Sequence, residues 1–140
     1  NTDKQTMNYS VKAEAVSKKM ASINIKQSKI NFGITPDTDD TLANPAELFL
    51  GSLSSCILKN VERFSGFMDF EYSRAEITIH ATRLEKPPRM DEINYELHIY
   101  SQDSNLNLDL LKKNIEKFGT IYNTVKISCK ITGTIKKISE

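Results

Sequence analysis

Cys56 and Cys129 are the residues whose side chains could carry out chemistry that most side chains cannot. The chain has no Cys-x-x-Cys pair and too few histidines for a zinc site, so no bound metal is expected. Residues 1–8 are polar and do not resemble a signal peptide, which favours a cytoplasmic location. Structural disulfides are rare in the cytoplasm, so each cysteine is either a small buried apolar group or a reactive thiol.

Cys56 lies in a segment that is predicted to be a helix. Its apolar residues recur at helical spacing, and they are Phe49, Leu53, Ile57, Val61 and Phe64. Asn44 is a favourable N-cap, Pro45 suits the first helical position, and Glu47 completes a capping box. The helix is expected to end near Gly66.

The neighbours of Cys56 on this helix allow two interpretations. Ser52, Lys59 and Arg63 lie on its polar side, at spacings of four, three and seven residues. A cation within reach stabilises a thiolate, which is the form that attacks a peroxide. A free cysteine at the border of an apolar stripe is also a common core residue.

The elements that must position this helix are mostly strands. Period-two alternation predicts strands at residues 7–15, 21–25, 30–32, 75–81, 93–99 and 125–135. A second helix is expected to be capped by Ser104 or Asn105 and to end at Gly119. This order of elements predicts one α+β domain over residues 1–140.

Cys129 and Tyr122 are weaker candidates for a site. Cys129 shares the inward face of the last predicted strand with Ile127 and Ile131, which is typical of a buried thiol. It could still resolve an oxidised Cys56 if folding brings the two sulfurs together. Tyr122, after the second helix, either lines a pocket or covers the core.

Composition excludes some classes of partner. The net charge is +1, and no basic block or aromatic-basic stripe is present, so nucleic acid is not an expected partner. No apolar run approaches the roughly 20 residues that span a bilayer, so no membrane insertion is expected.

Residues 44–56, NPAELFLGSLSSC, resemble the first-helix signature of the OsmC/Ohr family, which includes organic hydroperoxide resistance proteins. The predicted order of elements matches this family along nearly the whole chain. The resemblance implies an intertwined α+β homodimer, in which antiparallel sheets wrap around central helices and the sites lie at the subunit boundary. It also implies a thiol-dependent reduction of organic hydroperoxides, without a cofactor.

In the family, a first-helix thiolate attacks the peroxide and a second cysteine resolves the sulfenic acid formed. An arginine from the N-terminal strands, held by a glutamate at the helix start, supports the thiolate. Cys56 matches the attacking position, but Ala46 follows Pro45 where the glutamate is expected. Glu47 comes one residue later, about 100° around the helix.

Two further parts of the family site are not matched. No arginine precedes Arg63, so the N-terminal strands offer only lysines. Gly119 takes the place expected for the second cysteine. Arg63 could substitute for the arginine because its guanidinium can hold a peroxide or a carboxylate.

Two functional hypotheses follow. The first is a hydroperoxide reductase that works through Cys56, with an external thiol as reductant and Cys129 as a weak candidate for internal resolution. The second is a catalytically inactive homodimer that binds a small amphipathic or thiol-bearing ligand in the cleft between its subunits. The candidate binding residues are Glu47, Ser52, Lys59, Arg63 and Tyr122.

Overall fold

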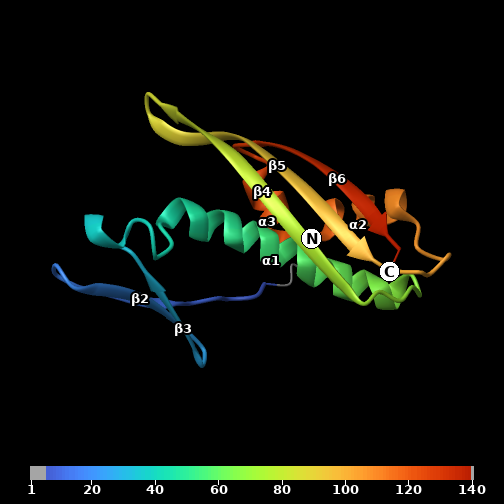
Figure 1. Ribbon diagram of the computed structural model, residues 1–140, viewed down its shortest axis with the longest axis horizontal. Helices are drawn as coiled ribbons and strands as arrows, with labels where there is room; N and C mark the ends of the chain where they lie inside the picture. The colour runs from blue at the N-terminus through green and yellow to red at the C-terminus, as the bar shows by residue number, and fades with distance from the viewer. Residues whose placement is uncertain (1–5, 140) are drawn as a thin grey trace. The chain divides into compact units, whose positions relative to one another are not determined.

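The computed structural model describes residues 6–139 (Figure 1). They fall into two compact units, which divide between Leu48 and Phe49. We call residues up to Leu48 the N-terminal unit and those from Phe49 the C-terminal unit. Whether residues 1–140 form a single domain, as the sequence predicts, is not tested by this division.

The N-terminal unit is a three-stranded antiparallel sheet in the order β1-β2-β3. The strands are β1 (Lys12–Val16), β2 (Met20–Ile25) and β3 (Ser28–Phe32). The two strands predicted at residues 21–25 and 30–32 are therefore confirmed. The first strand begins at Lys12 rather than at residue 7, because Lys12 already pairs with Asn24 near the end of β2. A short 3-10 helix, η1 (Pro36–Thr38), follows.

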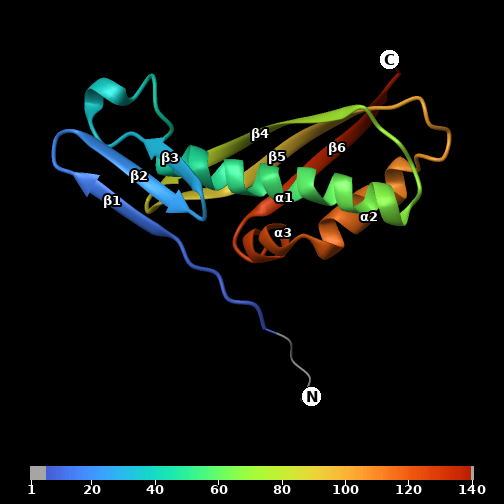
Figure 2. The same ribbon diagram turned by 90° about the horizontal axis from the view of Figure 1, so that it is seen from below.

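The C-terminal unit contains a mixed sheet and three helices. The elements in chain order are α1 (Pro45–Phe67, whose first residues belong to the N-terminal unit), β4 (Arg74–Glu85), β5 (Pro88–Tyr100), α2 (Leu108–Phe118), α3 (Thr120–Val125) and β6 (Lys130–Ile138). The helices lie on one face of the β4-β5-β6 sheet (Figures 1 and 2). The core forms between the inward face of β5 and the apolar stripes of the helices.

The predicted antiparallel pair at residues 75–81 and 93–99 is confirmed as β4 and β5. The pairing of β5 with β6 is parallel, in contrast to the antiparallel sheets that were expected. The chain leaves β5, crosses the sheet through α2 and α3, and returns along β6. A helical crossover of this kind joins parallel neighbours.

The last strand was predicted to begin at residue 125, and this starting point was wrong. Residues 120–125 form α3, and β6 begins only at Lys130. Val125, Ile127 and Cys129 alternate as in a strand, but Ile127 lies in the turn after α3 with 85% of its surface exposed. The tertiary position of this turn overrides the alternating pattern.

The predicted N-cap of the second helix was wrong by two or three residues. Asn107 caps α2, and its side-chain oxygen accepts a hydrogen bond from Leu110 N at 3.0 Å. Asn105 instead donates its backbone N–H to Asp103. Among residues 6–139, even the 23-residue α1 is not apolar enough to cross a membrane, and no other helix qualifies.

Candidate functional site

The predicted capping box is present at the N-terminus of α1. Glu47 N donates to Asn44 Oδ1 at 2.9 Å, and Asn44 N donates to Glu47 Oε1 at 3.0 Å. Both side chains therefore satisfy backbone groups that the first turn of a helix leaves unpaired. The carboxylate of Glu47, a predicted binding residue, is engaged in this cap.

Cys56 lies on α1 with its side chain half-buried, and its thiol is free. A Cβ atom built on Gly119 would lie 3.1 Å from Cys56 Sγ. Gly119 is buried at the junction of α2 and α3, with an extended backbone (φ −82°, ψ 116°). The sulfur of Cys56 is thus packed against the corner between α2 and α3, which we call the α2–α3 corner (residues 118–120).

The polar neighbours predicted for Cys56 are all exposed on α1, namely Ser52, Lys59 and Arg63. The Arg63 guanidinium lies over the rings of Phe64 and Phe67, at 5.5 and 5.6 Å from their centroids. It is two helical turns from Cys56, a rise of about 10 Å. These contacts associate Arg63 with aromatic rings further along α1 rather than with the thiol.

Tyr122 belongs to a partly buried polar cluster that was not predicted from the sequence. Glu116 Oε2 accepts hydrogen bonds from Tyr95 OH and from Lys112 Nζ, both at 2.8 Å. Burial, and next the negative charge of Glu116, raise the pKa of Tyr122 to about 12. Burial and the hydrogen bond to Glu116 also raise the pKa of Tyr95. We call Tyr95, Lys112, Glu116 and Tyr122 the Glu116 cluster.

One sequence signal could have pointed to this cluster. Tyr95 lies on the inward face of a strand that is otherwise aliphatic there, between Ile93 and Leu97. A buried tyrosine hydroxyl usually needs a hydrogen-bond partner. The partner itself could not be named, because Glu116 is 21 residues away in the chain.

Cys129 lies in different surroundings from Cys56. It is buried, and its Sγ is 3.5 Å from the backbone oxygen of Met90. It lines a small, mostly apolar cavity of about 230 Å³ with Phe49, Arg89, Met90 and Ser128. The buried thiol predicted for Cys129 is confirmed, whereas a role in resolving Cys56 stays a prediction.

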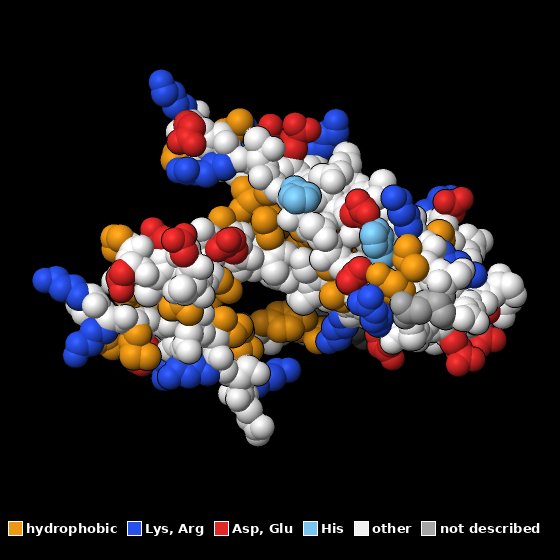
Figure 3. Space-filling view, viewed as in Figure 1, with side chains coloured by type: hydrophobic (Ala, Val, Ile, Leu, Met, Phe, Trp, Pro, Cys, Tyr) orange, Lys and Arg blue, Asp and Glu red, His pale blue; other side chains and the backbone are white. Residues whose placement is uncertain are grey.

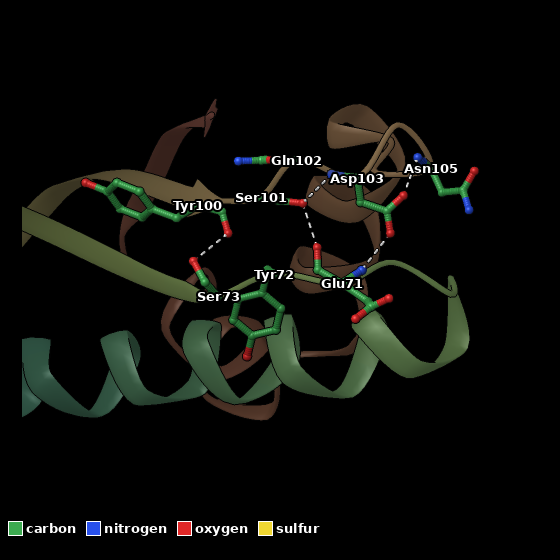
Figure 4. A pocket seen from close by; sticks show the side chains of 8 residues that line it. All are labelled: Glu71, Tyr72, Ser73, Tyr100, Ser101, Gln102, Asp103 and Asn105. Carbon is green, nitrogen blue, oxygen red and sulfur yellow. Dashed lines mark hydrogen bonds between the residues drawn. The ribbon is translucent and has the colours of Figure 1, made fainter. Parts of the chain in front are cut away.

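A larger open cavity of about 630 Å³ lies at the other end of β5 (Figure 4). The Ser101 hydroxyl donates to the backbone oxygen of Glu71 at 2.6 Å and accepts from Asp103 N. The Asp103 carboxylate accepts backbone N–H groups of Glu71 and Asn105, each at 2.8 Å. These contacts join the loop after β5 to the connection between α1 and β4, so their role is structural.

The described residues contain no group of three or more histidine, cysteine, aspartate or glutamate side chains arranged to hold a metal ion. On the face of the molecule shown in Figure 3, acidic and basic side chains are intermixed, in keeping with a net charge of +1.

The sequence has no significant match among curated proteins. Residues 37–133 match the family described as OsmC-like protein. The chain belongs to the OsmC-like family.

Solved structures agree with this family. An OsmC-like protein from Mycoplasma pneumoniae superimposes with a TM-score of 0.84 at 16% identity, covering 96% of this chain and 99% of that one. An organic hydroperoxide resistance protein OsmC from Legionella pneumophila gives a TM-score of 0.66 at 12% identity, covering 94% and 99%. The organic hydroperoxide resistance protein OhrB of Bacillus subtilis gives 0.60 at 14% identity, covering 91% and 98%.

In this OsmC-like chain, the residues predicted for the site do not all meet. Cys56 and Tyr122 both lie against Gly119. Glu47 is engaged at the start of α1, and Arg63 lies over aromatic rings beyond Cys56. The thiol and the α2–α3 corner are the parts that the C-terminal unit brings together.

Proposed function

We propose that this OsmC-like protein is a thiol-dependent redox protein in which Cys56 reduces organic hydroperoxides. The observation that carries the proposal is the free, half-buried thiol of Cys56 at the α2–α3 corner, within a family-matched segment. Two of the similar structures are organic hydroperoxide resistance proteins, which supports the same class of substrate.

The reaction would begin with attack of the Cys56 thiolate on one oxygen of the hydroperoxide. The O–O bond breaks, the alkoxide takes a proton and leaves as an alcohol, and Cys56 becomes a sulfenic acid. An external thiol then attacks the sulfenic sulfur, releasing water and leaving a mixed disulfide. A second external thiol attacks that disulfide and regenerates Cys56.

In this scheme an external thiol, rather than a second cysteine of the chain, resolves the sulfenic acid of Cys56. Gly119, the residue packed against Cys56 Sγ, has no sulfur. Cys129 is buried against Met90 in its own cavity. Small thiols are abundant in a reducing compartment, so we place the protein in the cytoplasm and expect it to work as a homodimer.

The test is consumption of cumene hydroperoxide with dithiothreitol as reductant. We expect Cys56→Ser to abolish turnover and Cys129→Ser to retain most of it, because only Cys56 is needed for both half-reactions. Equal turnover by the parent and by Cys56→Ser would contradict the proposal. Loss of turnover in folded Cys129→Ser would instead assign the resolving role to Cys129.

A second candidate function is ligand binding without turnover. It is favoured by Glu47 and Arg63, whose side chains are engaged with Asn44 and with aromatic rings rather than with Cys56. A chain of this kind would bind a small amphipathic or thiol-bearing molecule between its subunits. Ligand-dependent stabilisation of both the parent and Cys56→Ser, with no peroxide consumed, would favour this function over the first.

A further inference from the structure

Glu116 joins three elements of the C-terminal unit. It lies on α2, where Lys112, one turn earlier, donates to its carboxylate at 2.8 Å. Tyr95, from the middle of β5, donates to the same oxygen at 2.8 Å. Tyr122, on α3, is close enough to Glu116 for the carboxylate to contribute to its raised pKa. One carboxylate therefore connects the sheet to both helices that flank the α2–α3 corner.

Tyr95 gives this connection a rigid anchor. Its side chain is fully buried, with no exposed surface. Gly133, its neighbour on β6, leaves the space that the ring fills, because a Cβ atom on Gly133 would overlap the ring. The hydroxyl of Tyr95 is thus held at a fixed place above the sheet, and Glu116 is held by it.

The α2–α3 corner transmits this anchoring to Cys56. Gly119 follows Glu116 by one helical turn, and a Cβ atom on Gly119 would lie 3.1 Å from Cys56 Sγ and 3.1 Å from Tyr122 Cβ. Such spacing leaves no free room between the corner and the sulfur. Any movement of the corner would therefore change how much of the thiol is accessible.

We infer that Glu116 is a positioning residue for Cys56, which holds the α2–α3 corner against the thiol through its hydrogen bond with Tyr95. The reactivity of Cys56 then depends on a polar cluster that includes Tyr122, the residue that packs against the same corner. The expected effect of Glu116 on peroxide turnover rests on the proposed function. The expected effect of Glu116 on the accessibility of the Cys56 thiol does not depend on that function.

The experiment is alkylation of Cys56 by iodoacetamide in the folded protein, followed on the Cys56 peptide by mass spectrometry. Tyr95→Phe removes one hydroxyl and leaves Glu116 without its buried partner. We expect it to raise the alkylation rate about tenfold, because loss of the hydrogen bond that ties α2 to β5 loosens the packing of the corner. Glu116→Leu should raise the rate by a similar factor.

Three comparisons separate positioning from general loss of stability. Glu116→Gln keeps an acceptor for Tyr95 and should stay within about threefold of the parent rate. Lys113→Met lies on the same helix, is exposed, and should leave the rate unchanged. In the double variant Tyr95→Phe/Glu116→Leu, the increase should not exceed that of either change alone, because both break the same link.

Alkylation rates within twofold of the parent in folded Tyr95→Phe would overturn the inference. Full additivity of the two changes in the double variant would also overturn it, and where Glu116→Leu does not fold, the rate of Tyr95→Phe alone decides. Because alkylation needs no peroxide, these outcomes are distinct from failure of the proposed peroxidase activity, which Cys56→Ser tests separately.

Discussion

Gly119 lies at the position where a sulfur would meet Cys56. A Cβ atom there would be 3.1 Å from Cys56 Sγ. In a disulfide, each Cβ is about 3 Å from the partner sulfur, given an S–S bond of about 2.05 Å. The backbone of Gly119 is extended, so another residue can adopt its conformation. The geometry therefore suits a cysteine at residue 119.

We predict that Gly119→Cys forms a disulfide with Cys56 on mild oxidation. The close contacts of the new Cβ with Ile115 O and Tyr122 Cβ should cost about 1–3 kcal/mol in the reduced form. Thiol titration under denaturing conditions should fall from three thiols to one, the remaining thiol being Cys129. Thr120→Cys, one residue further and exposed, is the control and should keep all three.

Gly133 is required because the ring of Tyr95 occupies the space that a side chain at residue 133 would need. We predict that Gly133→Ala destabilises the protein by about 3 kcal/mol, because the new methyl group overlaps this buried ring. Gly66→Ala is the control, since a Cβ atom there meets nothing within 4 Å, and it should be neutral or stabilising. Urea denaturation of both variants measures the difference. Equal midpoints would contradict the role of Gly133.

For single residues, the sequence was sufficient to predict roles that depend only on neighbours in the same helix. The capping role of Glu47 follows from its spacing to Asn44, and the half-buried state of Cys56 follows from its place on the helical wheel. The link between Tyr95 and Glu116 could not be predicted, because it depends on how a strand and a helix pack. The contacts of Arg63 with Phe64 and Phe67 were not predicted either, although all three residues lie within two turns of α1.

The helices and strands could be predicted from the sequence where the periodic pattern of apolar residues was long. The bounds of α1 were predicted almost to the residue because its apolar stripe and its capping signals agree. The strand prediction failed at residues 125–129 because the end of a short helix and the turn after it carry an alternating pattern. The parallel pairing of β6 could not be predicted from its own residues, since it depends on the crossover through α2 and α3.

The first turn of α1 gives a prediction that separates capping from chemistry. Asn44→Ala should destabilise the protein by about 1 kcal/mol, because the N–H of Glu47 loses its acceptor. Glu47→Gln keeps the capping contact and should change neither stability nor hydroperoxide consumption appreciably. Thermal unfolding and the peroxide assay test the two variants. A large loss of turnover in folded Glu47→Gln would show that this carboxylate acts at the site.

The loop after β5 gives a prediction about pH. Hydrogen bonds from the backbone N–H groups of Asn105 and Glu71 lower the pKa of Asp103 below its ordinary value of 3.8. Because the folded pKa is the lower one, the stabilisation is complete above pH 3.8 and is lost as the pH falls further. Asp103→Asn should therefore reduce the difference in stability between pH 5 and pH 3. Urea denaturation at both pH values measures it, and an unchanged difference would refute this role of Asp103.

At the scale of the whole molecule, the N-terminal unit encloses little core of its own. Within residues 6–48, only Ala21 and Ser22 are buried. Large apolar side chains are exposed there, including Val16, Met20 and Ile30. A three-stranded sheet is stable only when an apolar face is covered. We propose that a second copy of the chain covers this apolar face.

The exposed face of α1 is suited to close approach by another helix. Gly51 and Ser55 are exposed on it, and a Cβ atom on Gly51 would meet nothing within 4 Å. The hydroxyl of Ser55 donates back to the oxygen of Ser52 at 2.8 Å, so it is turned toward its own helix. Small side chains with satisfied hydroxyls allow two helix backbones to pack at short distance.

We therefore predict a homodimer that depends on this face of α1. Light scattering after size-exclusion chromatography should give about twice the chain mass of 15.9 kDa. Ser55→Trp should shift the population to monomer, because an indole cannot fit between closely packed helices. Lys113→Trp, equally exposed but on α2, should remain dimeric. A parent protein of 15.9 kDa in solution, or a dimeric Ser55→Trp, would exclude α1 as the dimer contact.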